Sequence, residues 1–187
     1  MHLFLNRFKN ATLCVGTVAV AWLLFYKLNS FIFSYLETNQ FVSLVFMPAG
    51  IRLVSVLLLE EYAVIGLFIG ALLTSPLISV NLSQILIISL ISALNPYLAV
   101  HITKHLLKID NLLNNLHAKE LILMGVFSAG LNCISHHLYF YTVHIHTSWS
   151  DCASMFIGDL SGIFIMLFLF SMGLKFIRRS TLSTIPQ

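Results

Sequence analysis

The sequence predicts an all-α protein, a polytopic transmembrane helix bundle of about six spans with both termini in the cytoplasm. Hydrophobic residues make up 58% of the 187 residues and charged residues only 9%, with a mean hydropathy of +0.92. A soluble domain of this size cannot bury so much apolar surface, so the chain is expected to lie in a membrane. The apolar residues form continuous runs instead of alternating with polar ones, which favours helices over a barrel.

Six apolar runs are candidate spans, each near the ~17–25 residues that a bilayer requires. The first follows Arg7 and Lys9 without a small-residue cleavage site after it, so it is expected to be an uncleaved signal-anchor. The spans are Ala11–Tyr26, Val42–Leu59, Tyr62–Ser79, Ser83–Thr103 (interrupted by Asn95-Pro96), Glu120–Tyr141 and Ala153–Phe176. We therefore expect a cytoplasmic segment (residues 1–10), one membrane domain (residues 11–176) and a cytoplasmic tail (residues 177–187).

The positive charges predict the orientation. They precede the first span, separate the fourth from the fifth and follow the sixth: Arg7, Lys9, Lys104, Lys108, Lys119, Lys175, Arg178 and Arg179. With six spans these groups share one side, and the other side keeps only Lys27. Because cytoplasmic loops carry the excess of Lys and Arg, both termini are expected in the cytoplasm of a multi-pass inner (plasma) membrane protein surrounded by lipid.

Arg52 is the most costly residue of the second span. Its guanidinium cannot realistically lose its proton, and at mid-membrane it must be paired or wetted. Pro48 and Gly50 stand in the same run, where the proline removes a backbone donor and the glycine allows a close helix contact. The sixth span supplies Asp159 at a similar depth, and both side chains point toward the outer face. We therefore expect Arg52 and Asp159 to pair, directly or through water.

Other polar residues are expected in the same outer half of the membrane. The fifth span brings Asn132, His136 and His137 there, and the fourth contributes Asn95. Two interpretations follow: a polar ligand pocket floored by Arg52 and Asp159, or a fixed ion pair that only holds helices together. Single Asn residues also link helices without binding a ligand.

Small residues at helical spacing predict the packing faces. Gly66 and Gly70 in the third span, and Gly158 and Gly162 in the sixth, each lie four residues apart. Such spacing lets helices approach closely in lipid. We expect these glycines to pack helices together.

Eight histidines raise the alternative of a metal or haem site. His101 and His105 are one turn apart, and His144 and His146 follow the fifth span near His136-His137. Histidines at an interface are usually only solvated, so no metal and no cofactor is expected. An absorption spectrum of the purified chain would separate the haem hypothesis from the others.

No motif predicts an enzyme or a nucleic-acid-binding protein. The sequence lacks a nucleophile elbow, a Gly-rich phosphate loop and a zinc-protease helix, and the net charge of +3 is too small to indicate nucleic acid. Cys14, Cys133 and Cys152 form no metal or redox motif in the sequence and are expected to be structural thiols.

Four motifs together resemble the membrane-associated sensor domains of the first type (MASE-type). They are Met47-Pro48-Ala49-Gly50-Ile51, Gly66-Leu67-Phe68-Ile69-Gly70-Ala71, Asn95-Pro96, and Trp149 followed by Phe156-Ile157-Gly158-Asp159-Leu160-Ser161-Gly162. Their order and spacing agree from about residue 41 to residue 174. The resemblance implies a bacterial inner-membrane sensory module. Such modules usually precede a histidine kinase or a cyclic-di-GMP synthesis domain, and this chain is expected to stand alone without an output domain.

Three hypotheses for the function follow from these residues. In the first, a receptor module binds a small ligand or a membrane partner around Arg52 and Asp159. It would act on a separate cytoplasmic kinase or cyclic-di-GMP protein. One form of this hypothesis has two copies of the chain act together as a homodimer. In the second, the chain is a small transporter or a substrate-binding transporter subunit, because interrupted helices and midplane charges are typical of that class. The third is the haem- or metal-binding membrane protein named above.

Overall fold

The computed structural model describes residues 2–39, 42–75, 81–110, 113, 116–145 and 148–183. Within these ranges the chain is almost entirely helical, which confirms the all-α prediction. The elements in order are α1 (His2–Phe33), a 3-10 turn (Ser34–Leu36), β1 (Glu37–Asn39), β2 (Val42–Ser43), α2 (Pro48–Leu59), α3 (Glu61–Thr74), α4 (Leu82–Leu107), α5 (Ala118–Thr142) and α6 (Trp149–Ser183). The strands β1 and β2 form a small antiparallel hairpin.

Four of the described helices are long and apolar enough to cross a membrane. These segments are Asn10–Leu36, Leu82–Leu107, Ala118–Thr142 and Trp149–Gly173. Helix α2 has 12 residues and α3 has 14. At 1.5 Å per residue they measure roughly 18 and 21 Å, less than the hydrocarbon thickness of ~30 Å. Neither α2 nor α3 is therefore a full helical span, although the sequence predicted one at each position.

Helix α2 begins at Pro48 and not at Val42, so the sequence prediction for this proline was wrong. Pro48 occupies the first turn of the helix. At that position the missing N–H would have had no partner within the helix, and the fixed φ of proline suits the helical conformation. The proline therefore starts α2 and does not interrupt it. The third span also differs from the prediction, because α3 ends at Thr74 and residues 76–80 lie outside the described ranges.

Helix α4 is continuous through Asn95-Pro96, where the sequence predicted an interruption. Pro96 lies inside the helix from Leu82 to Leu107. A proline removes one backbone hydrogen bond, but membrane helices tolerate it where neighbouring helices supply polar groups. Helix α5, which packs along α4, supplies such groups close to Pro96.

The segment Leu44–Met47, between β2 and α2, has no regular secondary structure, yet each of its four backbone N–H groups donates a hydrogen bond. Leu44 N donates to Leu36 O (3.0 Å), Val45 N to Ser43 Oγ (3.4 Å), Phe46 N to Gly158 O (3.0 Å) and Met47 N to Asn29 Oδ1 (2.8 Å). Irregular backbone at membrane depth is tolerated only where protein satisfies it. Here the partners come from α1, the 3-10 turn, β2 and α6.

The glycines at 158 and 162 make room for this irregular segment. A Cβ atom at Gly158 would overlap the carbonyl of Ser43, and one at Gly162 would overlap the carbonyl of Phe46. The sequence predicted a helix–helix face here, but these two glycines receive non-helical backbone instead. Gly66 and Gly70 do face a helix, because a Cβ atom at Gly66 would meet Val18 of α1 and one at Gly70 would meet Trp22 of α1. Gly50 of α2 lies against Met166 of α6.

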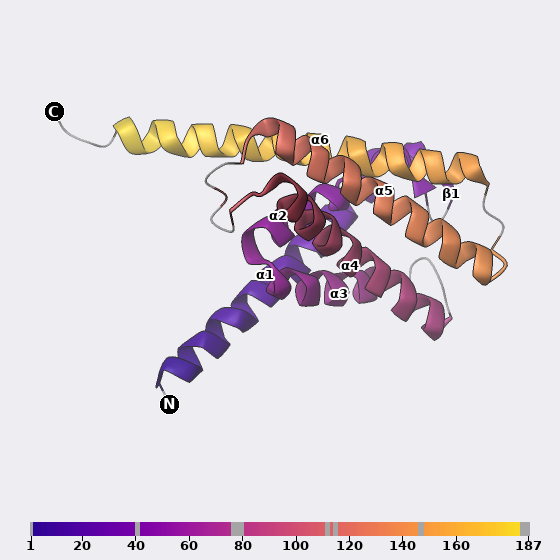
Figure 1. Cartoon of the computed structure of the whole chain (residues 1–187), viewed down its shortest axis with the longest axis horizontal. Helices are drawn as coiled ribbons and strands as arrows, with labels where there is room; N and C mark the ends of the chain where they lie inside the picture. The colour runs from indigo at the N-terminus through magenta and orange to yellow at the C-terminus, as the bar shows by residue number, and fades with distance from the viewer. Residues whose placement is uncertain are drawn as a thin grey trace.

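Helix α2 lies in the middle of the bundle and contacts all five other helices (Figure 1). Its residues Leu53 and Val56 are fully buried, together with Leu67, Met124 and Ile163 of three neighbouring helices. Large apolar side chains are exposed on the long helices, as expected for faces in contact with lipid. The helix that carries Arg52 is thus shielded from the surroundings by the rest of the chain.

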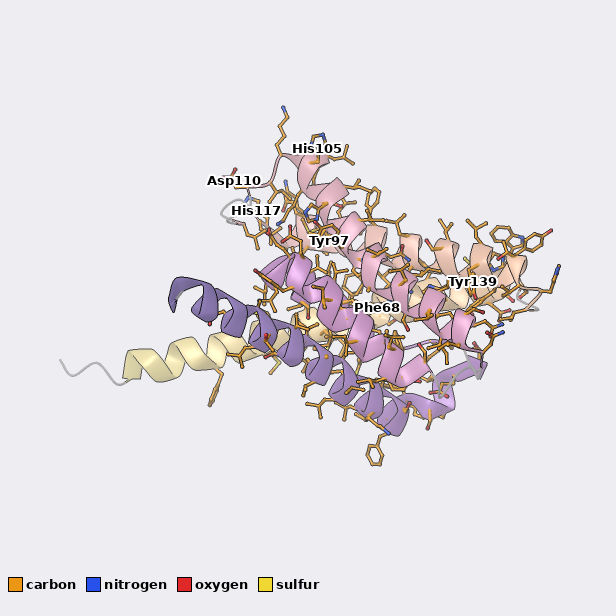
Figure 2. All side chains as sticks on the ribbon, turned by 90° about the horizontal axis from the view of Figure 1, so that it is seen from below. Phe68, Tyr97, His105, Asp110, His117 and Tyr139 are labelled. Atoms are coloured by element: carbon orange, nitrogen blue, oxygen red, sulfur yellow. The ribbon has the colours of Figure 1, made fainter. Side chains whose placement is uncertain are left out.

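The chain reverses direction at two ends of the bundle. The first turns of α1 and the last turns of α6 extend from the same end (Figure 1). His105, Asp110 and His117 gather at that end, whereas Tyr139 lies toward the other (Figure 2). The turn between α2 and α3 also belongs to the first end, because Glu60 there accepts a hydrogen bond from Lys104 near the end of α4 (3.5 Å). The β hairpin and the start of α6 lie at the opposite end.

Candidate functional site

The pair between Arg52 and Asp159 joins α2 to α6 in the interior of the bundle. Arg52 Nη2 donates to Asp159 Oδ1 at 2.7 Å, and each residue is only 2% exposed. A buried charge pair must gain enough from its mutual attraction and added hydrogen bonds to offset the loss of water around both ions. The structure thus contains the direct contact between Arg52 and Asp159 that the sequence predicts. Other polar groups around the pair supply the added hydrogen bonds.

Asn132 and His136 of α5 extend the pair into a polar network. Asn132 Nδ2 donates to Asp159 Oδ2 at 2.6 Å, so both carboxylate oxygens accept a hydrogen bond. One turn later, His136 Nδ1 lies 2.9 Å from the backbone oxygen of Asn132. Because a carbonyl can only accept, this contact places the proton of the neutral imidazole on Nδ1. The other ring nitrogen, Nε2, is left as an acceptor facing Ser92 Oγ on α4 (3.5 Å).

Two aromatic rings flank the Arg52 guanidinium. Its Cζ atom lies 5.9 Å from the centroid of the Trp22 ring and 5.6 Å from that of the Phe46 ring. Such cation–π contacts grow stronger when water is excluded. Trp22 is itself fixed by a hydrogen bond from its indole Nε1 to Thr74 Oγ1 (3.1 Å). The guanidinium is thus held between an anion and two π faces.

Two buried polar atoms of the network have no hydrogen-bond partner among the described residues. They are Nε of Arg52 and Oδ1 of Asn132, one a donor and the other an acceptor. A buried polar group left unpaired costs roughly 1–3 kcal/mol. The network therefore has residual hydrogen-bonding capacity beside the ion pair.

A cavity of about 370 Å³ opens next to this network. Its lining runs from the buried ion pair to exposed residues near the hairpin, Ser30 and Glu37. Helix α1 contributes one face to it, with residues spaced as expected for a single side of a helix. The lining residues are Trp22, Tyr26, Asn29, Ser30, Glu37, Val42, Ser43, Phe46, Arg52, Ala71, Thr74, Ser75, Ile88, Ser92, Asn132, His136, Phe140, Met155 and Asp159. All six helices and the hairpin therefore take part in a pocket of a size suited to a small molecule.

Asn95 and His137, which the sequence placed in the pocket, do not line the cavity. Asn95 links α4 to α5 instead: its Nδ2 donates to Leu131 O (3.4 Å) and its Oδ1 accepts from Ser135 Oγ (3.3 Å). The ring of His137 packs against that of Trp149 at an interplanar angle of 37°, with centroids 4.7 Å apart. Successive residues of a helix point about 100° apart, so His136 and His137 cannot both face one cavity.

Sequence reasoning missed the contribution of α1. Asn29 is 3% exposed and holds the backbone of Met47, while Trp22 faces Arg52. The spacing of Trp22, Tyr26 and Asn29 on one helical face was available in the sequence as a signal. The partner of Asn29 is a backbone N–H in an irregular segment, and no sequence pattern indicates such a contact.

The histidines do not converge in the described part of the chain. Among the described residues there is no group of three or more His, Cys, Asp or Glu side chains placed to hold a metal ion. His101 packs on Tyr97, more than two helical turns beyond Ser92 toward the C-terminus of α4. His146 lies outside the described ranges. The network around Arg52 offers hydrogen-bond donors, acceptors and charged groups, which are suited to binding a polar group of a ligand.

Comparison with protein-family models, with curated proteins and with solved structures finds no match for this chain. The case for its function therefore depends on the cavity and on the contacts of the residues around it.

Proposed function

We propose that this chain is the membrane-embedded receptor module of a bacterial inner-membrane sensory system. It would bind a small amphipathic ligand in the 370 Å³ cavity and belong with the MASE-type sensor domains that its motifs resemble. The observation that carries this proposal is a cavity that ends on a buried ion pair. Ionisable residues inside a membrane are costly and most often mark a functional site.

The lining of the cavity defines the ligand that it suits. One end presents Arg52, Asp159 and Asn132, and the walls include the rings of Trp22 and Phe140. Arg52 and Asp159 neutralise one another, so the deep end offers donors and acceptors but little net charge. An amphipathic molecule with a polar head and an apolar or aromatic body matches both regions.

We place the chain in the membrane as six crossings, with both termini on the cytoplasmic side. Four crossings would be the long helices, and the other two would contain the shorter helices. In one of these, the irregular segment Leu44–Met47 leads into α2, and the other contains α3. The clustering of Lys104 with the α2–α3 turn at one end supports this arrangement, since positive residues favour the cytoplasmic side.

Helix α6 is the candidate route for a signal. Asp159 on α6 touches the pocket, and the same helix continues to Ser183, beyond the rest of the bundle (Figure 1). A ligand that changes the Arg52–Asp159 contact acts directly on this helix. Such a ligand transmits a signal only if it binds two conformations with different affinity. A separate cytoplasmic kinase or cyclic-di-GMP protein would respond to the end of α6.

Blocking the mouth of the cavity should abolish ligand binding without unfolding the protein. Ser30→Trp places a large ring at an exposed position of the lining. Leu28→Trp, at an exposed position of α1 outside the lining, is the matched control. Native mass spectrometry of the chain extracted with its lipids should show a bound small molecule in the wild type and the control. The Ser30→Trp chain should lose it at unchanged thermal stability. Equal occupancy in all three chains would contradict the pocket.

The relay has its own test, because the proposed signal has to reach a cytoplasmic partner. Purification of the tagged chain in mild detergent should recover a cytoplasmic kinase or a cyclic-di-GMP protein. Recovery should fall when Lys175, an exposed residue near the end of α6, is changed to Glu. Lys27→Glu at the opposite end of the bundle is the control. Recovery of no membrane or signalling partner from the wild type would contradict the relay while leaving the pocket intact.

A transporter is the second candidate, and one observation favours it. The irregular segment Leu44–Met47 leads into α2 beside a buried ion pair, and discontinuous helices of this kind form the substrate sites of many transporters. Uptake of the molecule found by mass spectrometry into reconstituted vesicles would favour the transporter. Binding without uptake would favour the receptor.

A further inference from the structure

The polar groups at the deep end of the cavity offer one donor and two acceptors. Arg52 Nε is a buried donor and Asn132 Oδ1 a buried acceptor, and neither has a hydrogen-bond partner among the described residues. His136 Nε2 is a second acceptor, because Nδ1 carries the proton that faces Asn132 O. Ser92 Oγ lies 3.5 Å from Nε2, at the outer limit for a hydrogen bond, so this acceptor is only weakly used. The three residues line the cavity and are at most 3% exposed.

The three side chains are held in place by the hydrogen bonds that they already make. Arg52 Nη2 and Asn132 Nδ2 donate to the two oxygens of the Asp159 carboxylate, at 2.7 and 2.6 Å. His136 lies one helical turn from Asn132 and bonds its backbone oxygen at 2.9 Å. The carboxylate also fixes the orientation of the Asn132 amide, because only the amide nitrogen can donate to it. The unused atom of Asn132 is therefore its oxygen, an acceptor.

We infer that the ligand of this cavity carries an uncharged primary carboxamide at its buried end, an inference that rests on the receptor pocket proposed above. The carbonyl oxygen of such a group accepts from Arg52 Nε, and its two N–H groups donate to Asn132 Oδ1 and His136 Nε2. A hydroxyl group provides only one donor and leaves one of the two acceptors unused. The apolar body of the ligand contacts the rings of Trp22 and Phe140 in the cavity wall.

The buried ion pair argues against a charged head on the ligand. Asp159 already neutralises Arg52 at 2.7 Å, and the described lining residues include no other Lys or Arg to pair with a carboxylate head. An ammonium head would lie close to the guanidinium and would offer no acceptor to Arg52 Nε. Either ion would also lose its hydration on entering the buried end of the cavity. A neutral amide avoids both costs.

A series of ligands that share one body and differ in the head tests this inference on the unaltered network. The probes are phenylbutanamide, phenylbutanol, phenylbutanoate, phenylbutylamine and butylbenzene. The chain has two tryptophans, Trp22 in the cavity wall and Trp149, which is exposed outside the lining. In a Trp149→Phe chain in lipid nanodiscs, the fluorescence of Trp22 reports binding, with each affinity referred to the ligand concentration in the lipid. Phenylbutanamide should bind about tenfold more tightly than butylbenzene or either charged ligand, with phenylbutanol in between.

The ligand series separates an error in the head from an error in the pocket. Ser30→Phe in the same background fills the mouth of the cavity and should remove the saturable signal. If no ligand gives a signal that Ser30→Phe removes, the pocket is wrong and the inference fails with it. If butylbenzene or a charged ligand binds as tightly as the amide, the pocket stands and the carboxamide is wrong. Equal binding of phenylbutanol and the amide would also overturn the carboxamide, because the ligand would then need only one donor.

The variant Arg52→Lys tests the role of Nε in the recognition of the head. Lysine keeps the positive charge and can donate to Asp159, but it has a methylene group where arginine has Nε. The preference for phenylbutanamide over butylbenzene should fall to about threefold, while the affinity for butylbenzene stays the same. Lys104→Arg, at a buried cation outside the cavity lining, is the matched control and should keep the full preference. An unchanged preference in Arg52→Lys would overturn the inference, and if this variant folds poorly the ligand series decides by itself.

Discussion

Replacing Asp159 with Asn should lower the free energy of unfolding by about 3–5 kcal/mol, the usual cost of leaving one partner of a buried pair uncompensated. The change leaves the Arg52 guanidinium, at 2% exposure, without the carboxylate that lies 2.7 Å away. Arginine cannot relieve this by losing a proton. Thermal unfolding in detergent, together with the amount of folded protein in membranes, measures the loss. Asp110→Asn, which removes an exposed carboxylate in the α4–α5 loop, is the matched control. It should change neither the thermal stability nor the amount of folded protein in membranes.

The two partners should not be equivalent. Arg52→Met leaves Asp159 buried, but a carboxyl can take up a proton and become neutral, so this variant should be less damaged than Asp159→Asn. The double variant Arg52→Met with Asp159→Leu removes both charges and should recover most of the stability, since buried pairs replaced by apolar residues are often near neutral. If the double variant is no more stable than Asp159→Asn, the two charges do not depend on one another and the pairing argument fails.

Gly162→Ala should destabilise the fold, although alanine is the better helix former. The added methyl group would overlap the carbonyl of Phe46 and lie 2.8 Å from the backbone nitrogen of Met47. Overpacking of this kind costs roughly 1–3 kcal/mol, more than the 0.5–1 kcal/mol that Gly-to-Ala gains in a helix. It would also displace Phe46 from Arg52 and disturb the hydrogen bond from Met47 to Asn29. The same unfolding measurement should show the loss.

Two glycines serve as controls for that substitution. A Cβ atom at Gly173, on the same helix, or at Gly130, on α5, would meet no other atom within 4 Å. Gly173→Ala and Gly130→Ala should therefore be neutral or slightly stabilising. Should Gly162→Ala behave like these two, the close approach of the irregular segment to α6 would be the wrong explanation for the glycine.

The sequence predicted those features that follow from the cost of polar groups in lipid. A cation at position 52 required an anion, and Asp159 was at the right depth, so their contact could be inferred from residue counting alone. The glycines at 66, 70, 158 and 162 were recognised as positions of close approach. These inferences succeed because a membrane penalises an unpaired charge strongly and leaves few residues able to compensate it.

The sequence did not predict where the backbone departs from helix. Val42–Leu59 is a continuous apolar run, and hydropathy does not distinguish an extended strand, an irregular segment and a helix within it. Pro48 was assigned to a helix interior, whereas it starts a helix. Asn95 and His137 were assigned to the pocket on depth alone, because the rotation of each side chain about its helix depends on packing that the sequence does not state.

The burial of α2 has a consequence for how the chain is made. Arg52 is synthesised 107 residues before Asp159, so the emerging polypeptide carries its deepest cation through most of translation with no counter-ion. In the membrane placement that we propose, α2 cannot rest against lipid at low cost during that interval, because the carboxylate that pairs with Arg52 is on α6. Biogenesis would then have to hold α2 and its neighbours in a provisional arrangement, and we expect truncations that remove α6 to be degraded.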